Sequence, residues 1–390
     1  MRILALTSIR SDYDLMSPLY RKLATDPSFD FGIIVGGTHN SDFHNDSGRN
    51  IVKDGLHIVA KVFNFVGNDD YISQISSGAK LLESIGVAIE QFLPDLILVV
   101  GDREDALMLS IAATYMRIPL VHFYGGDHAS DGHVDNQVRH AISKLATVHF
   151  VTMDVHRDRL ISMGEEPHRI RVVGSIALDN FFSEPSIARS DLFRELFPKS
   201  LNESDSIGFL LYHPIVEEME EFENSFDALL NSIIGRGMHL IIGKSNNDPK
   251  FLHLEVFMSK YRNHPGVHFI ESLGRTEYIN LMRNIEIMLG NSSAGLLELA
   301  SLKVPVVNIG ARQRGRYADR NVIFSDLSSV EIEKSIEFAL SQEFNHDLRN
   351  LKNSYGDGNS VKKVMTELKS VDYKNLIKKR MDPLDAIGPE

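Results

Sequence analysis

Cysteine and tryptophan are both absent from the 390-residue sequence. Without cysteine the chain has no disulfide, no thiol nucleophile and no zinc site with thiolate ligands. Its apolar runs all stay below the length of about 18 residues that a membrane-spanning helix needs, so we expect no membrane partner. Residues 2–9 have the pattern of a strand and lack the apolar core and cleavage site of a signal peptide, which predicts a cytoplasmic protein.

Positive charge is also in short supply. The 41 Lys and Arg against 53 Asp and Glu give a net charge of −12, which argues against nucleic acid as a partner. A local phosphate site is still possible, because helix N-termini and a few arginines bind phosphate whatever the total charge. The length exceeds what one hydrophobic core usually serves, so two domains are expected.

Short apolar runs alternate with helical patterns along the chain, a rhythm typical of parallel sheets covered by helices on both faces. The rhythm weakens between residues 174 and 206, where turn residues gather, and then restarts. We therefore predict two doubly wound, Rossmann-like α/β domains, residues 1–180 and 181–370, with a cleft between them and a tail at 371–390. The predicted strands span residues 3–9, 31–35, 95–100, 120–123, 148–151, 170–173, 207–212, 239–242, 267–270, 285–289, 304–308 and 321–324. The predicted helices span residues 14–24, 72–92, 105–117, 135–145, 155–163, 217–234, 249–261, 276–282, 294–301 and 329–341.

The segment 285–302 has the pattern of a phosphate-binding turn. An apolar strand ends at Gly290, Ser292 and Ser293 offer hydroxyls, and a helix is predicted to follow. The N–H groups and the positive dipole end of a helix N-terminus attract phosphate. Glu298, about one helical turn farther on, can accept hydrogen bonds from both hydroxyls of a ribose. The segment indicates a nucleoside diphosphate site, although an ordinary capped helix would give the same pattern.

Polar residues also collect where the strands of the first domain end, which is the edge at which parallel sheets bind ligands. Asp102 and Arg103 follow the most apolar of these strands, and a partly desolvated carboxylate beside a cation is a candidate general base. A helix-capping role for Asp102 is the alternative. Asp127 and Asp135 follow the next strand, and Asp135 can pair with Arg139, four residues farther on.

Three further side chains suit a diphosphate. Arg10 follows the first strand, His213 ends the first strand of the second domain, and Arg312 follows the strand after the phosphate-binding turn. Each of these side chains can place a positive charge beside a phosphate oxygen. The alternative to a binding role is a solvated side chain for the two arginines and a structural one for the histidine. Six histidines lie between residues 122 and 156 without the spacing H-E-x-x-H, so no metal site is expected.

A series of short motifs runs in fixed order along nearly the whole chain. They are Arg10-Ser-Asp-Tyr13, Gly101-Asp-Arg103, Gly125-Gly-Asp127, Arg139-His-Ala-Ile-Ser-Lys144, His213-Pro214, Gly290-Asn-Ser-Ser293, Asn308-Ile-Gly-Ala-Arg-Gln-Arg-Gly-Arg316 and Tyr355-Gly-Asp-Gly-Asn359. This set resembles the hydrolysing UDP-N-acetylglucosamine 2-epimerases of bacterial sialic-acid synthesis. The resemblance implies a GT-B-like fold, a UDP-sugar substrate, no cofactor, and a homodimer or dimer of dimers. The dinucleotide fingerprint G-x-G-x-x-G is indeed missing after the first strand.

The resemblance also implies roles for single residues. It makes Asp102 an acid/base group and places His213 beside the departing diphosphate. Relatives have Glu or His at the position of Tyr124, and a phenol with an ordinary pKa of about 10 is a poor base near neutral pH. We therefore expect Asp127 and Asp135 to share the acid/base work. The residues expected to bind substrate are Arg10, Arg103, Asn246, Asp248, Ser292, Ser293, Gly295, Glu298 and Arg312.

The expected reaction converts UDP-N-acetylglucosamine to N-acetylmannosamine and UDP. Loss of UDP from C1 acidifies the C2–H bond, so a carboxylate can remove this proton and leave 2-acetamidoglucal. Addition of water at C1 and of a proton to the other face of C2 completes the inversion. The alternatives are the same reaction on a UDP-linked 2,4-diacetamido-2,4,6-trideoxyhexose, a GT-B glycosyltransferase, and a nucleotide-sugar sensor without activity.

Overall fold

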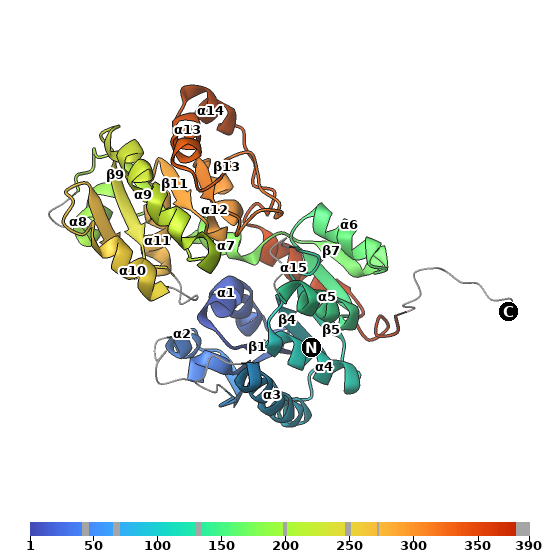
Figure 1. Ribbon diagram of the computed structural model, residues 1–390. Helices are drawn as coiled ribbons and strands as arrows, with labels where there is room; N and C mark the ends of the chain where they lie inside the picture. Colours follow the sequence, from blue (N-terminus) through green and yellow to red (C-terminus); the bar gives the residue numbers. More distant parts are fainter. Residues whose placement is uncertain are drawn as a thin grey trace. The chain divides into compact units, whose positions relative to one another are not determined.

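The chain forms two compact units in the computed structural model, which describes residues 1–40, 47–64, 71–128, 134–197, 201–245, 251–270 and 273–379 (Figure 1). The described residues up to Phe182 and those from Tyr355 onward form the first unit, and Ser183–Ser354 supplies the second. The first unit therefore takes its residues from both ends of the chain. Residues 355–370, which the sequence pattern assigned to the second domain, pack with the first unit instead.

The first unit is built on a seven-stranded parallel sheet in the order β3-β2-β1-β4-β5-β6-β7. The strands are β1 (Arg2–Thr7), β2 (Asp30–Val35), β3 (His57–Lys61), β4 (Leu96–Val100), β5 (Leu120–Phe123), β6 (Val148–Val151) and β7 (Ile170–Val172). The helices are α1 (Arg10–Thr25), α2 (Ser47–Lys53), α3 (Tyr71–Phe92), α4 (Glu104–Tyr115), α5 (Asp135–Leu145), α6 (Asp154–Ser162), α7 (Ile176–Ser183) and, from the far end of the chain, α15 (Ser360–Ser370).

The second unit is built on a six-stranded parallel sheet in the order β10-β9-β8-β11-β12-β13. The strands are β8 (Ile207–Leu211), β9 (His239–Gly243), β10 (Val267–Ile270), β11 (Ile287–Gly290), β12 (Val306–Ile309) and β13 (Val322–Ser325). The helices are α8 (Arg189–Leu196), α9 (Met219–Ile234), α10 (Phe251–Ser259), α11 (Arg275–Met282), α12 (Ser293–Leu297), α13 (Ser329–Ala339) and α14 (Gln342–Leu348). The predicted fold class, two Rossmann-like α/β domains, is confirmed.

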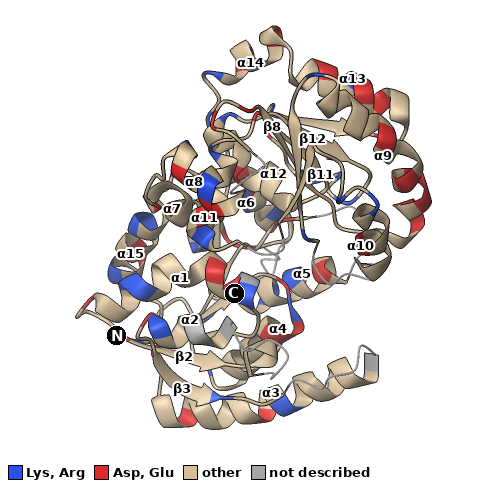
Figure 2. Cartoon of the chain, turned by 90° about the vertical axis from the view of Figure 1, so that its left-hand side faces the viewer, with Lys and Arg blue, Asp and Glu red and all other residues tan. Residues whose placement is uncertain are grey.

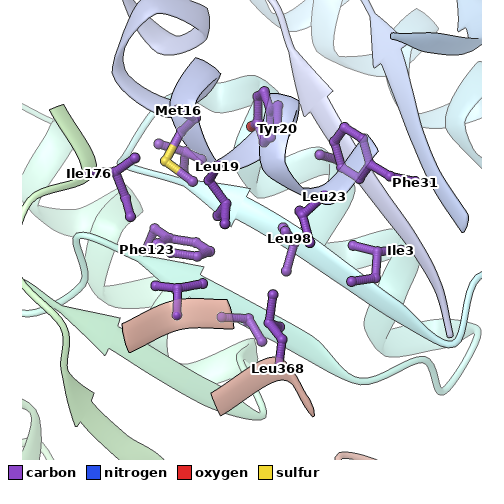
Figure 3. Close-up of a cluster of buried hydrophobic side chains, with 14 of the residues drawn as sticks. Ile3, Met16, Leu19, Tyr20, Leu23, Phe31, Leu98, Phe123, Ile176 and Leu368 are labelled. Atoms are coloured by element: carbon purple, nitrogen blue, oxygen red, sulfur yellow. The ribbon is translucent and has the colours of Figure 1, made fainter. Parts of the chain in front are cut away.

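The core of the first unit explains why the end of the chain returns to it. One cluster of buried side chains joins β1, β4 and β5 to one face of α1, and α15 adds Val364, Met365 and Leu368 (Figure 3). Burial of an aliphatic side chain of this kind stabilises a fold by about 1.5–3 kcal/mol. The contribution of α15 is therefore a large fraction of the stability expected for one domain.

Both sheets reverse their strand order once, and ligands of open α/β sheets bind beyond the carboxyl ends of the strands at such a reversal. In the first unit the reversal lies between β1 and β4, and in the second between β8 and β11. The turns that leave these strands begin at Ser8, Gly101, Tyr212 and Asn291. Most of the predicted site residues lie in or near these turns.

Several elements differ from the prediction. The helices that the sequence pattern missed are α2, α7, α8, α14 and α15. The edge strand β3 was missed, because its residues are at most partly buried and its apolar run is only three residues long. The helix predicted at 294–301 ends after five residues as α12, and a 3₁₀ turn follows at Leu299–Leu302.

Charged residues are spread unevenly over the helices. Acidic residues follow one another along α9, and basic residues gather on α15 (Figure 2). None of the helices in the described ranges is both long and apolar enough to cross a membrane.

Candidate functional site

The turn predicted to bind phosphate joins β11 to α12 in the second unit. Gly290 has φ +115°, and a Cβ there would lie 2.2 Å from the carbonyl oxygen of Leu211 at the end of β8. Only glycine allows this close approach of the two strand ends. Ser292 caps α12, and its hydroxyl accepts from the N–H of Ala294 at 3.4 Å. The sequence therefore folds here into a tight turn with hydroxyls at a helix start.

Asn291 fastens this turn to the end of β8. Its carboxamide is fully buried, accepts from the His213 N–H at 2.7 Å and donates to the His213 carbonyl at 2.8 Å. The Asn291 carbonyl in turn accepts from Arg312 at 3.3 Å and from the buried Gln313 at 3.1 Å. The His213 backbone and the Arg312 guanidinium are thus joined to the turn that carries Ser292, and the binding roles of the three residues stay predictions. The bridging roles of Asn291 and Gln313 were missed, because they depend on contacts between distant residues.

Glu298 is a buried carboxylate beside the turn. Its Oε1 accepts from the Arg275 guanidinium at 3.4 Å, whereas Oε2 makes no hydrogen bond of normal geometry within the described residues and lies near the Tyr278 phenol. Burial raises the pKa of Glu298 although Arg275 lowers it. An unsatisfied buried acceptor is costly, so a ligand hydroxyl that donates to Oε2 would bind favourably. The Arg275 pairing joins residues 23 positions apart and has no local sequence signal.

Gly295 has a packing role in the structure. A Cβ on this residue would lie 2.8 Å from Cγ1 of Val306 on β12, and its N–H donates to the Ser292 carbonyl at 3.2 Å. Glycine therefore lets α12 lie close to the sheet. The substrate contact that the sequence predicted for Gly295 stays a prediction.

A cavity of about 90 Å³ opens at the carboxyl ends of β8, β9 and β10, the same edge of the sheet. Its walls combine apolar and aromatic side chains with a few polar ones, as in many small-molecule sites. Tyr212, which precedes His213, contributes to the wall. The lining includes Leu210, Tyr212, Ile242, Lys244, Met258 and Phe269.

In the first unit, Arg139 contacts both Asp102 and Asp127, two of the predicted acid/base residues. It is 3% exposed, pairs with the Asp102 carboxylate, and donates to the Asp127 carbonyl at 3.2 Å and to Asn136 at 3.0 Å. The sequence suggested that Arg139 pairs with Asp135, four residues earlier on the same helix. In the structure Arg139 forms an ion pair with Asp102. The alternative of Asp102 as a helix cap is wrong, because Arg103 holds the N-cap position of α4.

Two acidic residues that the sequence analysis passed over lie near Asp102. Burial and the charges of Asp105, Asp102 and Glu104, opposed by Arg103, together raise the pKa of Asp12 to about 7. Burial and Glu104 likewise raise the pKa of Asp105 to about 6. This end of the sheet therefore holds several carboxyl groups that compete for protons near neutral pH, a property common at functional sites.

Tyr124, the departure from the family pattern, serves the backbone. Its hydroxyl oxygen accepts from the N–H of Ile176 at 3.0 Å, at the start of α7. Burial raises the pKa of Tyr124 to about 12, so the phenol keeps its proton at neutral pH. The residue has φ +64° and packs against the core of the first unit. Tyr124 is therefore a structural residue rather than a base.

The remaining predicted residues have fewer contacts that bear on function. Arg10 is exposed and pairs with Asp14 at 3.3 Å, and Arg103 lies 3.8 Å from Glu104. Asp135 is the first residue of α5, and Ser293 the first of α12. Their roles stay predictions. Asn246 and Asp248 lie outside the described residues.

No group of three or more His, Asp or Glu side chains in the described part of the chain is arranged to hold a metal ion. The buried histidines make other contacts. His122, for example, bonds the Gly101 carbonyl at 2.8 Å and Ser143 at 3.1 Å, and burial lowers its pKa to about 3.

Comparison with known proteins adds a family. The family profile described as "UDP-N-acetylglucosamine 2-epimerase" matches residues 21–369. The chain is 32% identical to the UDP-N,N'-diacetylbacillosamine 2-epimerase (hydrolyzing) of Legionella pneumophila, over 95% of this chain and 96% of that protein. It is 30% identical to the GDP/UDP-N,N'-diacetylbacillosamine 2-epimerase (hydrolyzing) of Campylobacter jejuni, over 88% of each.

Among solved structures, the UDP-GlcNAc 2-epimerase of Neisseria meningitidis bound to UDP-GlcNAc matches with a TM-score of 0.82. The match covers 95% of this chain and 100% of that one at 18% identity, so it speaks for the fold.

Proposed function

Because the chain belongs to the UDP-N-acetylglucosamine 2-epimerase family, we propose that it is a hydrolysing 2-epimerase of UDP-linked 2-acetamido sugars. The structural observation that carries the proposal is the cluster of Ser292, His213 and Arg312, joined through Asn291 at the strand-order reversal of the second unit. Hydroxyls, an imidazole and a guanidinium at the end of a parallel sheet suit a diphosphate.

The reaction needs a leaving group before it needs a base. The C2 proton of the sugar is not adjacent to a carbonyl, so no side chain can remove it directly at a useful rate. Departure of UDP leaves positive charge at C1, which acidifies the C2–H bond. A carboxylate then takes the proton, and the product is a 2-acetamidoglycal. Water adds to C1, while a proton returns to the opposite face of C2, and the sugar is released with inverted configuration.

In this proposal the second unit holds UDP. Ser292, Ser293 and Arg312 bind the diphosphate, and His213 stabilises its charge as it leaves. One well-placed donor of this kind typically lowers a barrier by about 3 kcal/mol. Glu298, whose buried Oε2 lacks a regular partner among the described residues, accepts from the ribose. The base lies in the cavity lined by Tyr212 and Phe269. Asn246 and Asp248 keep their predicted part in substrate binding.

The first unit supplies the acid/base groups. Asp102, Asp127 and Asp135 remain the proposed set, because inversion at C2 requires proton transfer on two faces and therefore more than one group. The Arg139 guanidinium supports this assignment, since it fixes the Asp102 carboxylate and the Asp127 backbone at once. Tyr124 is left out, because its phenol is bonded to the start of α7.

For the sugar, we favour a UDP-linked 2,4-diacetamido-2,4,6-trideoxyhexose, the alternative raised by the sequence. The two relatives reported above, at 32% and 30% identity, are both named for N,N'-diacetylbacillosamine, which is such a sugar. UDP-N-acetylglucosamine, the first expectation from the sequence, is the second candidate, supported by the description of the family profile.

Incubation of the protein with each donor separately in heavy water tests the proposal. We expect UDP and the free 2-epimer, which carries deuterium at C2. We also expect kcat/KM to be at least about 10-fold higher for the trideoxy donor, since small differences in a sugar pocket discriminate by this factor or more.

Three outcomes would contradict parts of the proposal. Recovery of a sugar still linked to UDP would refute hydrolysis. Transfer to an acceptor without deuterium at C2 would identify a glycosyltransferase. Tight binding of both donors without release of UDP at high protein concentration would identify a sensor.

A further inference from the structure

A buried histidine outside the predicted site lies against Asp127. His156, on the first turn of α6, is 2% exposed, and its Nε2 lies 3.4 Å from Asp127 Oδ1. Its Nδ1 lies 2.6 Å from the hydroxyl oxygen of Thr152, which is also buried. The ring of Tyr355 meets the imidazole edge-on at a centroid distance of 6.4 Å. The imidazole is therefore held at both nitrogens and on its side.

The turn that carries Asp127 rests directly on this helix. Gly126 has φ +79°, and a Cβ there would lie 2.3 Å from the carbonyl oxygen of His156. Arg159, one turn along α6, donates to the Gly126 carbonyl. The glycine therefore lets the backbone of the turn lie close against α6. The position of Asp127 then depends on the α6 residues that contact this turn.

We propose that His156 is a positioning residue for Asp127, held by Thr152 as the tautomer that carries its hydrogen on Nε2. The hydrogen bond at one ring nitrogen decides which nitrogen keeps the proton. When the Thr152 hydroxyl donates to Nδ1, the N–H group is at Nε2 and points to a carboxylate, which can only accept. The inference rests on the proposed function, in which Asp127 exchanges a proton with the sugar.

The other groups around Asp127 fit this role. The backbone N–H of His128 donates to Asp127 Oδ1 at 2.8 Å, so it meets His156 at the same oxygen. Arg139 of α5 and Arg159 of α6 bind backbone carbonyls of the turn rather than the carboxylate. His156 is thus the side chain whose contact sets the direction of the Asp127 carboxylate from the α6 side.

Two substitutions separate positioning from packing. The amide nitrogen of glutamine can occupy the place of Nε2, whereas that of asparagine corresponds to Nδ1. We expect His156→Asn to lower kcat about 100-fold and His156→Gln to stay within about 10-fold of the wild type, a span typical of acid/base contributions. KM and the Kd for UDP should change less than about 3-fold in both, since UDP is proposed to bind to the second unit and His156 belongs to the first. The pH profile of kcat should shift in His156→Asn and be restored in His156→Gln.

Thr152→Val tests the tautomer without removing the imidazole, and we expect an intermediate loss of kcat. Asp158→Asn, at an exposed position of the same helix, is the control and should match the wild type.

Wild-type kcat and pH profile in both His156 variants would overturn the inference. Equal losses in both, together with weaker UDP binding or a lower Tm, would also overturn it and indicate a packing role. A wild-type protein that turns over neither donor would refute the proposed function itself.

Discussion

The two units place different chemistry at the same point of the same kind of sheet. In the second unit the strand ends at the reversal are joined by the neutral carboxamide of Asn291, next to Ser292 and Gln313. In the first unit the corresponding ends carry Asp12 and Asp102, with Arg139 among them. Strand order therefore decides where the site lies, and the side chains at the turns decide what it does.

The difference also separates binding from proton transfer. Amides and hydroxyls keep their hydrogens at any ordinary pH, so they suit an anion that must be held in every state of the reaction. Carboxyl groups crowded together have raised pKa values, and the structure gives about 7 for Asp12 and about 6 for Asp105. Groups of this kind can take up and release protons near neutral pH.

The largest effect is expected at Asp102. Asp102→Asn should lower kcat about 1000-fold, because it removes a proposed acid/base group, while the Kd for UDP stays within about 2-fold. Steady-state kinetics and UDP calorimetry measure the two quantities. Glu104→Gln, at a 45% exposed neighbour, is the control and should be near normal. A parallel loss of UDP binding in Asp102→Asn would break the separation between the units.

Two glycines compare the turns themselves. Gly290 and Gly101 both have positive φ, but a Cβ at Gly290 would strike the Leu211 backbone, whereas one at Gly101 meets nothing within 4 Å. Gly290→Ala should therefore lower the free energy of unfolding by at least about 3 kcal/mol, and Gly101→Ala by about 1 kcal/mol. Urea unfolding followed by circular dichroism measures both. Equal losses of unfolding free energy in the two variants would mean that the positive φ alone determines the destabilisation, and that the close approach of Gly290 to Leu211 adds nothing.

A substitution of Arg312 tests the proposal that the second unit binds UDP. Arg312→Gln should weaken UDP binding about 10- to 150-fold, because a hydrogen bond to a charged group is worth about 1.5–3 kcal/mol. Arg314→Gln is the matched control, since this neighbouring arginine is 44% exposed and pairs with Asp326. Calorimetric titration with UDP measures both variants. Similar losses in the two would show that the charge of the loop matters rather than the position of Arg312.

A further effect is a dependence of stability on pH. Burial and nearby carboxylates raise the folded-state pKa of Asp12 to about 7, against an unfolded value of about 4. The folded state thus binds this proton more tightly, and the stabilisation, complete below about pH 4, is lost as the pH rises through about 7. Asp12→Asn should therefore gain stability relative to the wild type between about pH 5 and pH 8, measured as urea midpoints. Asp14→Asn, at a 38% exposed position of the same helix, is the matched control.

Much of the fold could be predicted because buried parallel strands are continuous apolar runs. The strands at 120–123, 148–151 and 267–270 were predicted to the residue. The turn from β11 to α12 was also predicted, because its glycine and its capping serine lie within three residues of each other in sequence. The edge strand β3 was missed, since an exposed edge needs no apolar run.

What the sequence could not supply were contacts between distant residues. Arg139 pairs with Asp102 rather than with Asp135, its neighbour along the helix. Arg275 reaches Glu298, and His156 reaches Asp127, across similar gaps in sequence. A single sequence carries the local pattern of each residue, but its partner is selected only when the sheet brings separate turns to one edge.

The return of α15 to the first unit has a consequence for synthesis on the ribosome. Residues 1–182 emerge first, yet their core lacks Val364, Met365 and Leu368 until nearly the whole chain has been made. Residues 183–354, a single uninterrupted stretch, have all their strands well before that. The half of the protein that is translated first is therefore the half that must wait, with part of its apolar surface exposed, for its last helix.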